Sequence, residues 1–280
     1  MNNIGIICNR NAGRGRAPQL LDAIMRRLKE EGIPFTLLNG DETLSIDTCS
    51  RIWIIGGDGT LNRFINAYPN VTIPLAIFKG GTGNDFAWKI HGEKSFDECF
   101  ETALRGEPRP IDAGICNKKY FINGVGIGFD AEVARAINNG GKRKSDFSYL
   151  AAVLQKIFRY AEKQMTLQVG GQVKDAMLFM VTAANGSRYG GGFLVAPQAV
   201  IDDGLLDIVL IKKVPPILRF AYLPMVKKGK HLHLPFVETM RCDHICISSD
   251  NCLAAHLDGE ILEGKIFDIQ ILPAHFSFLF

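Results

Sequence analysis

The sequence predicts two domains of different fold class within its 280 residues. Through about residue 111, apolar strand-like runs alternate with amphipathic helical stretches, which is typical of an α/β domain built on a parallel sheet. Beyond Met165, short apolar runs separated by turn residues indicate a mostly antiparallel β domain. We therefore expect a first domain at 1–112 and a second at 113–280. The last few residues are candidates to return to the first domain.

The first half of the chain contains the strands and helices that an α/β domain requires. Short runs of β-branched and other apolar residues indicate strands at 4–8, 35–38, 52–55 and 75–78. Apolar residues at helical spacing predict helices at 18–31, 60–66 and 95–105. Because strand and helix alternate throughout, a parallel sheet is expected.

The sequence pattern changes in the second half of the chain. A glycine-dense stretch at 121–130 is expected as a turn, followed by an exposed loop at 140–144 and a helix at about 147–163. Short strands are then expected at 165–169, 176–183, 205–211, 243–248 and 266–271. One helix, at about 216–230, interrupts them. This spacing favours antiparallel pairing.

Composition excludes some classes of function. The formal net charge is only +3, which argues against a dedicated nucleic-acid binder but permits local basic patches. No apolar stretch approaches the roughly 18 residues that a membrane-spanning helix needs. The first residues lack the basic and apolar segments of a signal peptide.

The seven cysteines indicate a reducing compartment. Several lie inside apolar runs, so buried thiols are expected. Cys242, Cys246 and Cys252 lie near two histidines, but their spacings do not match a structural zinc site.

The segment Gly56-Gly57-Asp58-Gly59-Thr60 follows directly on the predicted strand at 52–55. Glycines let a backbone approach a phosphate, and a helix N-terminus offers N–H groups and a favourable dipole to it. A carboxylate at such a place suits a magnesium ion or a proton transfer. The simpler interpretation is that Asp58 only caps its helix.

A second glycine cluster strengthens the phosphate interpretation. Gly80 to Asp85 follow the predicted strand at 75–78, and the carboxyl ends of neighbouring strands in an α/β sheet form ligand sites. The loop at 9–16, rich in asparagine, glycine and arginine, suits contacts to phosphates as well. No Walker A lysine motif is present, so the pattern is not that of a P-loop kinase.

These motifs resemble a known family. GGDGTLN at 56–62 and GTGNDFA at 81–87 are similar to the catalytic domain of bacterial diacylglycerol kinases and related lipid kinases, which share a superfamily with sphingosine kinases, NAD kinases and phosphofructokinases. The resemblance implies an NAD kinase/phosphofructokinase-like first domain and a β-sandwich second domain, with the active site in the cleft between them. The chain departs from the family pattern at Arg10, Arg63 and Trp88.

The resemblance also implies ATP and Mg²⁺ as cofactors. Asp58 and Asp85 are expected to organise magnesium and the acceptor, and Glu260, in the DGE segment at 258–260, to take the proton from the acceptor hydroxyl. Without the resemblance, this segment would be taken as a surface turn. The residues expected to bind the nucleotide are Asn9, Asn11, Gly13, Gly15, Gly56, Gly57, Gly59, Thr60, Asn62, Gly81, Thr82, Gly83 and Asn84.

A third acidic turn, at 202–207, has two interpretations. It is either a simple Asp-Gly turn or, by the resemblance, a structural magnesium site. The implied ligands are the Asp203 carboxylate and the carbonyl oxygens of Val200 and Leu205. Oxygen-only ligation suits magnesium.

The helix expected at 216–230 combines an apolar stretch with several lysines. It is either a core-facing helix with a solvated lysine face or a surface that docks on anionic lipid. The expected partners are accordingly a lipid alcohol and a transient membrane surface, with a homodimer left open and no nucleic acid. We expect a cytoplasmic protein, peripheral at the inner membrane surface.

Taken together, the motifs predict an ATP- and Mg²⁺-dependent lipid kinase. Diacylglycerol is the favoured acceptor, which would give phosphatidic acid, and another long-chain alcohol is the nearest variant. An NAD kinase-like enzyme shares GGDG, although GTGND is not the pattern expected there. A non-catalytic nucleotide- or lipid-binding regulator would be expected to lack Asp58 or Glu260, and both are present.

Overall fold

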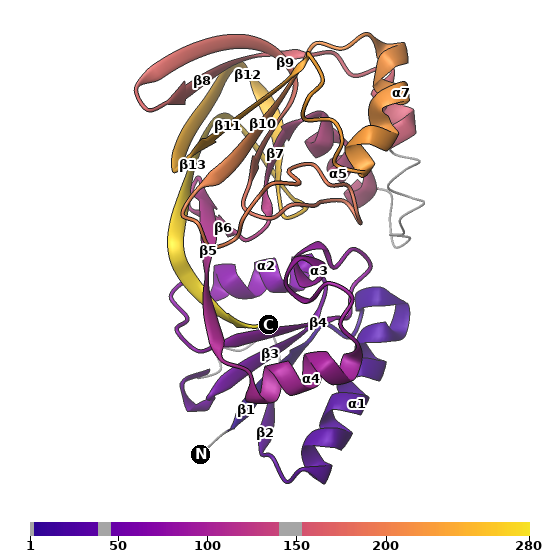
Figure 1. Ribbon diagram of the computed structural model, residues 1–280, viewed down its shortest axis with the longest axis vertical. Coiled ribbons are helices and arrows are strands. Elements are labelled where there is room, and N and C mark those ends of the chain that lie inside the picture. The colour runs from indigo at the N-terminus through magenta and orange to yellow at the C-terminus, as the bar shows by residue number, and fades with distance from the viewer. Residues whose placement is uncertain (1–2, 39–45, 140–152) are drawn as a thin grey trace. The chain divides into compact units, whose positions relative to one another are not determined.

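The computed structural model describes residues 3–38, 46–139 and 153–280 (Figure 1). By its internal contacts the chain forms two compact units. The first comprises Met1–Ile111 together with Ala274–Phe280, and the second comprises Asp112–Pro273. The end of the chain therefore returns to the unit in which it began.

The first unit is built on a parallel sheet with the order β4-β3-β1-β2. Its strands are β1 (Ile4–Cys8), β2 (Phe35–Leu38), β3 (Arg51–Gly56) and β4 (Leu75–Lys79). The last residues of β13 (Glu260–Leu279) add a parallel neighbour to β4, with Phe278 opposite Leu75. The central strand β3 is buried almost throughout, as its continuous apolar run predicts.

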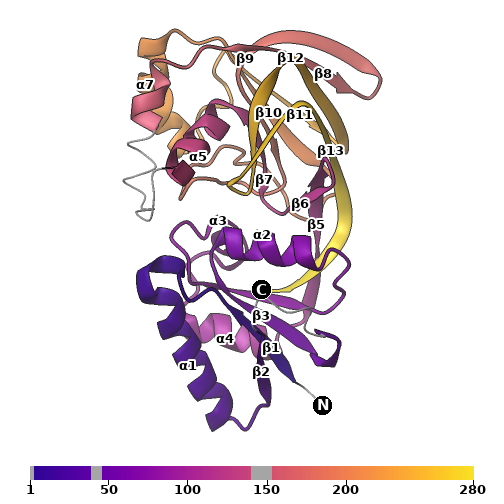
Figure 2. The ribbon, with the colours of Figure 1, turned by 180° about the vertical axis from the view of Figure 1, so that it is seen from behind.

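Helices cover both faces of this sheet (Figure 2). One face carries α1 (Arg16–Glu30) and α4 (Phe96–Arg105), and the other carries α2 (Asp58–Ala67) and α3 (Asp85–His91). Between the sheet and the first pair, Trp53 packs against Phe78 and Phe100 with ring centroids 5.3 Å apart in both cases. The loops at the carboxyl ends of β1, β3 and β4 therefore lie at the edge of the sheet where α/β domains bind ligands.

The second unit is an antiparallel β structure with the order β11-β10-β9-β7-β12-β13. The strand β8 pairs with both β9 and β12, and β5 forms a hairpin with β6. The bounds are β5 (Pro108–Cys116), β6 (Lys119–Phe121), β7 (Gly124–Gly128), β8 (Lys163–Val169), β9 (Gln172–Ala184), β10 (Leu206–Lys212), β11 (Val237–Cys242) and β12 (His244–Leu257).

Side-chain alternation along β10 gives this unit two cores. Leu206, Ile208 and Leu210 join a core enclosed by strands, whereas Val209 and Ile211 join a second core. The second core lies against α5 (Phe129–Asn139), a helical turn at 153–157 and α7 (Pro216–Lys227). Both faces of β10 are therefore buried.

The structure corrects two of the sequence-based expectations. The stretch at 121–130 is not a turn only, because Gly124–Gly128 form the buried strand β7. The helix expected at 147–163 ends by residue 157 in the described part, since Lys163 already pairs in β8. Residues 140–152, with the expected loop at 140–144 and the start of that helix, lie outside the described residues.

Two further features of the described residues concern membrane crossing and the cysteine thiols. None of their helices has the length and apolar character to cross a membrane. The seven cysteines, all within the described ranges, are unpaired thiols. Burial raises the pKa of the Cys116 thiol to about 12 and that of Cys242 to about 11. Thiolate chemistry is therefore not expected from these two groups.

Candidate active site

Three loops follow β1, β3 and β4 in the first unit and are tied together by their backbones. The N–H of Asn9 donates to the carbonyl oxygen of Ile55 (3.1 Å), and the N–H of Gly80 donates to that of Gly56 (2.9 Å). The side chain of Asn9 donates to Thr60 Oγ1 (3.3 Å). The loops that the sequence predicts to bind the nucleotide are therefore joined to one another by hydrogen bonds.

Glycine is required where these loops touch. A Cβ on Gly13 would lie 2.1 Å from the carbonyl oxygen of Gly80, and one on Gly81 would lie 2.4 Å from the Cα of Gly57. Both neighbours are backbone atoms, which cannot move away cheaply. Gly15 differs, because open space surrounds it and its φ of 93° accounts for the glycine.

Asp58 caps a helix, but not its own. Its Oδ2 accepts the N–H of Asp85 (3.1 Å) and its Oδ1 accepts that of Phe86 (3.0 Å), both in the first turn of α3. The carboxylate thus compensates the positive end of α3 and satisfies two N–H groups that a helix leaves unpaired. Asp58 is thus a helix cap, but the helix is α3 and not α2, as the simpler interpretation had it.

The loop between β4 and α3 is braced from within. Asn84 has a left-handed φ of 53°, and its side chain accepts the N–H of Gly81 (2.8 Å) and donates to the Gly81 carbonyl oxygen (2.9 Å). The guanidinium of Arg16 also reaches that carbonyl oxygen (3.3 Å). Arg16 was not among the predicted residues, although its place in the GRGR segment at 13–16 was a signal for it.

The remaining predicted residues of the first unit have different exposures. Thr60, Asn62 and Asp85 are buried, whereas Asn11 and Thr82 are exposed. Gly59 lies in the first turn of α2, and Gly83 directly precedes Asn84. Asp85 is thus a buried carboxylate within the capped turn of α3.

In the second unit, Asp258 ties the DGE turn to the backbone of residues 122–124. Its carboxylate accepts three backbone N–H groups, those of Ile122 (2.8 Å), Asn123 (2.9 Å) and Gly124 (3.0 Å). Asp258 and Gly259 both have positive φ, 49° and 93°. This fixed turn presents Glu260 as an exposed side chain at the start of β13.

A buried polar cluster supports the same turn. His256 Nε2 lies 3.4 Å from Asp130 Oδ2, and the N–H of Gly259 donates to His256 Nδ1 (3.4 Å). Tyr189 stacks edge-on against the His256 ring at 5.6 Å, and burial, with the Asp130 and Asp258 charges, holds the pKa of its phenol well above the usual value. The sequence analysis missed these residues; the glycines of β7, which leave room for them, were the available signal.

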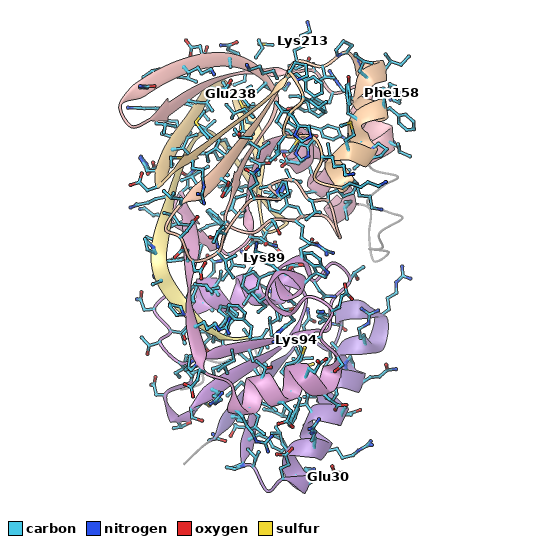
Figure 3. The ribbon with its side chains drawn as sticks, viewed as in Figure 1. Glu30, Lys89, Lys94, Phe158, Lys213 and Glu238 are labelled. Atoms are coloured by element: carbon cyan, nitrogen blue, oxygen red, sulfur yellow. The ribbon has the colours of Figure 1, made fainter. Side chains whose placement is uncertain are left out.

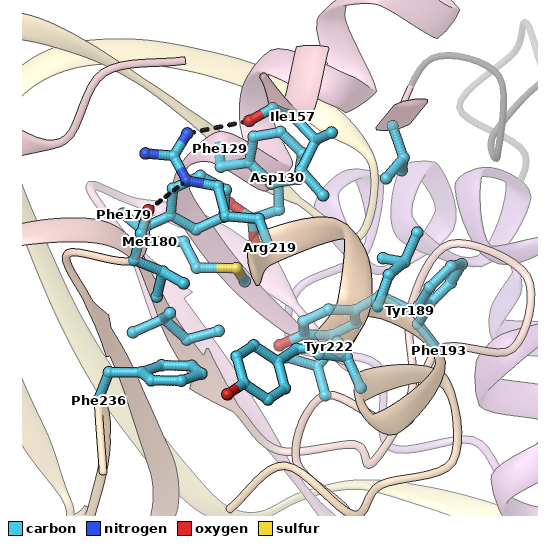
Figure 4. A pocket seen from close by; sticks show the side chains of 16 residues that line it. Phe129, Asp130, Ile157, Phe179, Met180, Tyr189, Phe193, Arg219, Tyr222 and Phe236 are labelled. Atoms are coloured by element: carbon cyan, nitrogen blue, oxygen red, sulfur yellow. Dashed lines mark hydrogen bonds between the residues drawn. The ribbon is translucent and has the colours of Figure 1, made fainter. Parts of the chain in front are cut away.

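An apolar pocket lies in the second core of this unit (Figure 4). Of its polar members, Arg219 is paired with Glu162 (2.7 Å) and donates to the carbonyl oxygens of Val214 and Ile157. Its charge is therefore compensated inside the wall. The lining residues are Phe129, Asp130, Val153, Ile157, Phe179, Met180, Tyr189, Phe193, Val195, Ile211, Val214, Arg219, Tyr222, Leu223, Val226 and Phe236.

The turn at 200–207 does not fit a magnesium site as it stands. Asp203 accepts the N–H of Leu205 (3.1 Å) and forms an ion pair with Arg241, which also lies 3.6 Å from Asp207. A guanidinium thus neutralises the carboxylate that the resemblance assigned to the metal. Among the described residues, no cluster of three or more His, Cys, Asp or Glu side chains could hold a metal ion.

Two family models match nearly the whole chain. The model described as diacylglycerol kinase catalytic domain matches residues 3–116, and the one described as YegS C-terminal NAD kinase beta sandwich-like domain matches residues 123–280. The chain belongs to the diacylglycerol kinase family. Membership confirms the resemblance drawn from residues 56–62 and 81–87, and the two-domain fold class with it.

Individual relatives of the family agree. A diacylglycerol kinase of Bacillus subtilis is 25% identical, with 94% of this chain and 92% of the relative covered. A Chromohalobacter salexigens protein named "Probable lipid kinase YegS-like" is 28% identical over 80% of this chain and 74% of its own length. The structure titled "Crystal structure of a putative diacylglycerol kinase from Bacillus anthracis str. Sterne" has a TM-score of 0.81 at 24% identity and covers 100% of this chain and 97% of its own, which shows the fold. As a member of this family, the chain is a kinase.

Proposed function

We propose that this kinase transfers the γ-phosphoryl group of ATP to the hydroxyl of a long-chain lipid alcohol, with diacylglycerol the favoured acceptor and phosphatidic acid the product. The observation that carries the lipid assignment is the apolar pocket of the second unit. Its aromatic and aliphatic lining suits an acyl chain, since each buried methylene contributes about 0.8 kcal/mol. Its buried cation, Arg219, is already paired with Glu162 and offers little to a polar acceptor.

The nucleotide is assigned to the linked loops of the first unit. The glycines that allow backbone contact between these loops, among them Gly13, Gly57 and Gly81, place no side chain between the backbone and a phosphate. Further predicted contacts are Asn9, Asn11, Gly15, Gly56, Gly59, Thr60, Asn62, Thr82, Gly83 and Asn84. Magnesium enters with ATP as part of the substrate and neutralises phosphate charge during transfer.

Three carboxylates have separate roles in this proposal. Glu260 takes the proton of the acceptor hydroxyl as the oxygen bonds to the γ-phosphorus, and the bond from that phosphorus to the β–γ bridging oxygen breaks to release ADP. Asp85 is assigned to the magnesium nucleotide. Asp58 is a positioning residue, because both of its oxygens accept N–H groups of α3.

The acceptor determines where the enzyme works. Diacylglycerol resides in a bilayer and ATP in the cytoplasm, so we infer a cytoplasmic protein that contacts the inner membrane surface transiently. The turn at Asp203 has no part in the reaction as proposed, since Arg241 compensates its charge.

Transfer of labelled phosphate from ATP into a panel of lipids in mixed micelles tests the proposal, with Glu260→Ala and Asp58→Ala alongside. We expect incorporation into diacylglycerol that both variants abolish or nearly abolish. Incorporation into NAD instead would overturn the lipid assignment and keep the ATP site. ATP binding without transfer to any acceptor would favour a regulator of the same fold.

A pocket-filling variant links the transfer to the pocket. Val226→Trp should raise the KM for a long-chain diacylglycerol more than for a short-chain one, because the indole occupies space assigned to the acyl chain. The matched control is Val173→Trp, at an exposed position on β9. Equal KM changes for both chain lengths would contradict an acyl role for the pocket.

A further inference from the structure

The first two turns of α7 carry apolar residues outward and a charge inward. Ile217 is 75% exposed, Phe220 51% and Leu218 40%, whereas Arg219 is only 7% exposed. This is the reverse of an ordinary surface helix, whose apolar stripe faces the core. The alternative of a core-facing helix with a solvated lysine face therefore fails for the first two turns of α7.

A neighbouring segment extends this apolar surface. Phe158, which follows the helical turn at 153–157, is 52% exposed and stacks on Phe220 with ring centroids 6.3 Å apart and an interplanar angle of 22°. Figure 3 shows Phe158 beside α7. We call Phe158, Ile217, Leu218 and Phe220 the outer apolar face. Four exposed large apolar side chains in one place mark an interaction surface.

Along the α7 part of the chain, the charged residues that accompany the outer apolar face are basic. Lys213 precedes α7, and Lys227, Lys228 and Lys230 end or follow it; all four are exposed. From 208 to 237 the sequence contains no aspartate or glutamate. An apolar helix face with lysines before and after the helix is complementary to an anionic lipid surface, where each nearby lysine contributes about 1 kcal/mol.

The inner side of the same helix lines the apolar pocket. Tyr222, Leu223 and Val226 of α7 belong to the pocket wall. Arg219 anchors the helix there, through Glu162 and through the carbonyl oxygens of Ile157 and Tyr160. One helix therefore has the pocket on one side and the outer apolar face on the other.

We propose that the outer apolar face inserts into the headgroup region of an anionic bilayer and brings the pocket to the lipid that it takes up. This inference rests on the proposed function for the identity of the lipid. The favoured occupant is a bilayer and not a second copy of the chain, because the lysines before and after α7 would repel those of the other copy across a two-fold contact.

Sedimentation with vesicles tests the outer apolar face directly. The probe is a vesicle of phosphatidylcholine and phosphatidylglycerol, and the variant is Ile217→Ser with Phe220→Ser. Loss of two inserted side chains should weaken binding by about tenfold or more. The matched control is Val173→Ser with Met177→Ser, which removes two exposed apolar residues of β9 and should bind as the wild type does. Unchanged thermal unfolding of both variants confirms that they are folded.

A charge variant separates the contribution of apolar insertion to vesicle binding from that of electrostatic attraction. Lys227→Glu with Lys228→Glu should weaken binding to the anionic vesicles several-fold and leave the weak binding to pure phosphatidylcholine vesicles unaltered. Binding of Ile217→Ser with Phe220→Ser equal to that of the wild type would overturn the proposal. Concentration-dependent dimers that this variant abolishes, without vesicle binding by the wild type, would overturn it too and make the face a contact between copies.

Activity on a soluble short-chain diacylglycerol separates the two proposals. We expect the outer-face variant to retain its activity there and to lose it selectively on vesicles. If the wild type bound vesicles through this face and phosphorylated no lipid, the surface assignment would stand and the proposed function would fail.

Discussion

The turns at Asp58 and Asp258 solve the same problem in two different folds. Each places an aspartate next to a glycine, and each carboxylate accepts backbone N–H groups from a glycine-rich segment far away in sequence. Asp58 holds the start of an α-helix in the parallel α/β unit, whereas Asp258 holds the start of a buried strand in the antiparallel unit. The residue proposed for chemistry lies in the segment that Asp58 holds, as Asp85, or two residues after Asp258 on the same turn, as Glu260.

The difference between the two turns lies in what the aspartate leaves exposed. Asp58 braces a segment in which Asp85 is buried, while Asp258 braces a turn from which Glu260 points into solvent. The comparison teaches that the aspartates of such motifs need not touch the substrate. In the proposed function, Asp58 fixes a backbone segment that binds the nucleotide, and Asp258 fixes the turn that carries the base Glu260.

The largest effect on kcat should come from Glu260, and a comparison with Asp258 distinguishes the proposed base from the residue that holds its turn. Glu260→Gln removes the proposed base and should lower kcat by about a hundredfold or more. It should leave the melting temperature unchanged, because the side chain is exposed. Asp258→Asn should lower both kcat and the melting temperature, since the neutral amide is a weaker acceptor for three N–H groups. Full activity in Glu260→Gln would end the assignment of a base to this turn.

Asp58→Asn probes the other side of the comparison. The amide can accept only through one oxygen, so the first turn of α3 loses one charge-assisted bond and a favourable dipole interaction, together about 1.5–3 kcal/mol. Chemical denaturation should show this loss, and kcat should fall with it. Asp22→Asn, at an exposed position of α1, is the control. An active Asp58→Asn enzyme of undiminished stability would show that the α3 cap is dispensable.

His91, in the last turn of α3, makes the stability of the protein dependent on pH. Burial lowers the pKa of His91 to about 4, and Nε2 contacts the Ile77 carbonyl oxygen at 3.0 Å. The unfolded chain therefore binds this proton more readily, so stability is complete above about pH 6.5 and falls as the pH drops towards 4. The expected loss is about 2–3 kcal/mol near the lower limit.

Urea unfolding at neutral pH and at about pH 4.5 measures this effect. His91→Gln should flatten the pH dependence, whereas His233→Gln, at an exposed position, should not. An unaltered pH profile in His91→Gln would mean that other groups govern acid sensitivity, and α3 would no longer be the acid-sensitive part of the Asp58 region.

The smallest effect is expected at a third Asp-Gly turn, that of Asp203. Because Arg241 pairs with this carboxylate, removal of divalent ions with EDTA should hardly change the melting temperature of the wild type. The pair is partly exposed, so Arg241→Ala should cost at most about 1 kcal/mol and should make stability respond to magnesium. Arg26→Ala, on the exposed side of α1, is the control. A wild type that melts earlier in EDTA would restore the magnesium interpretation.

Local pattern was enough to predict the framework of the first unit. The apolar runs at 52–55 and 75–78, each closed by glycines, became β3 and β4 at nearly the expected bounds, because strand burial and glycine turns are written in neighbouring residues. The same glycines located the loops of the candidate site. The buried strand β7 escaped because glycines in a strand look like a turn until the groups that fill their space, Asp130 and Tyr189, are known.

By itself, the sequence determined the fold class, the family motifs and the residue types at the site. Tertiary structure alone decided how each carboxylate is used: Asp58 accepts N–H groups of α3, Asp258 accepts those of residues 122–124, and Asp203 pairs with Arg241. It also decided that α7 turns Arg219 inward and Phe220 outward. The reason is physical. A carboxylate or an apolar helix face has several acceptable partners, and only the folded chain determines which of them is within reach.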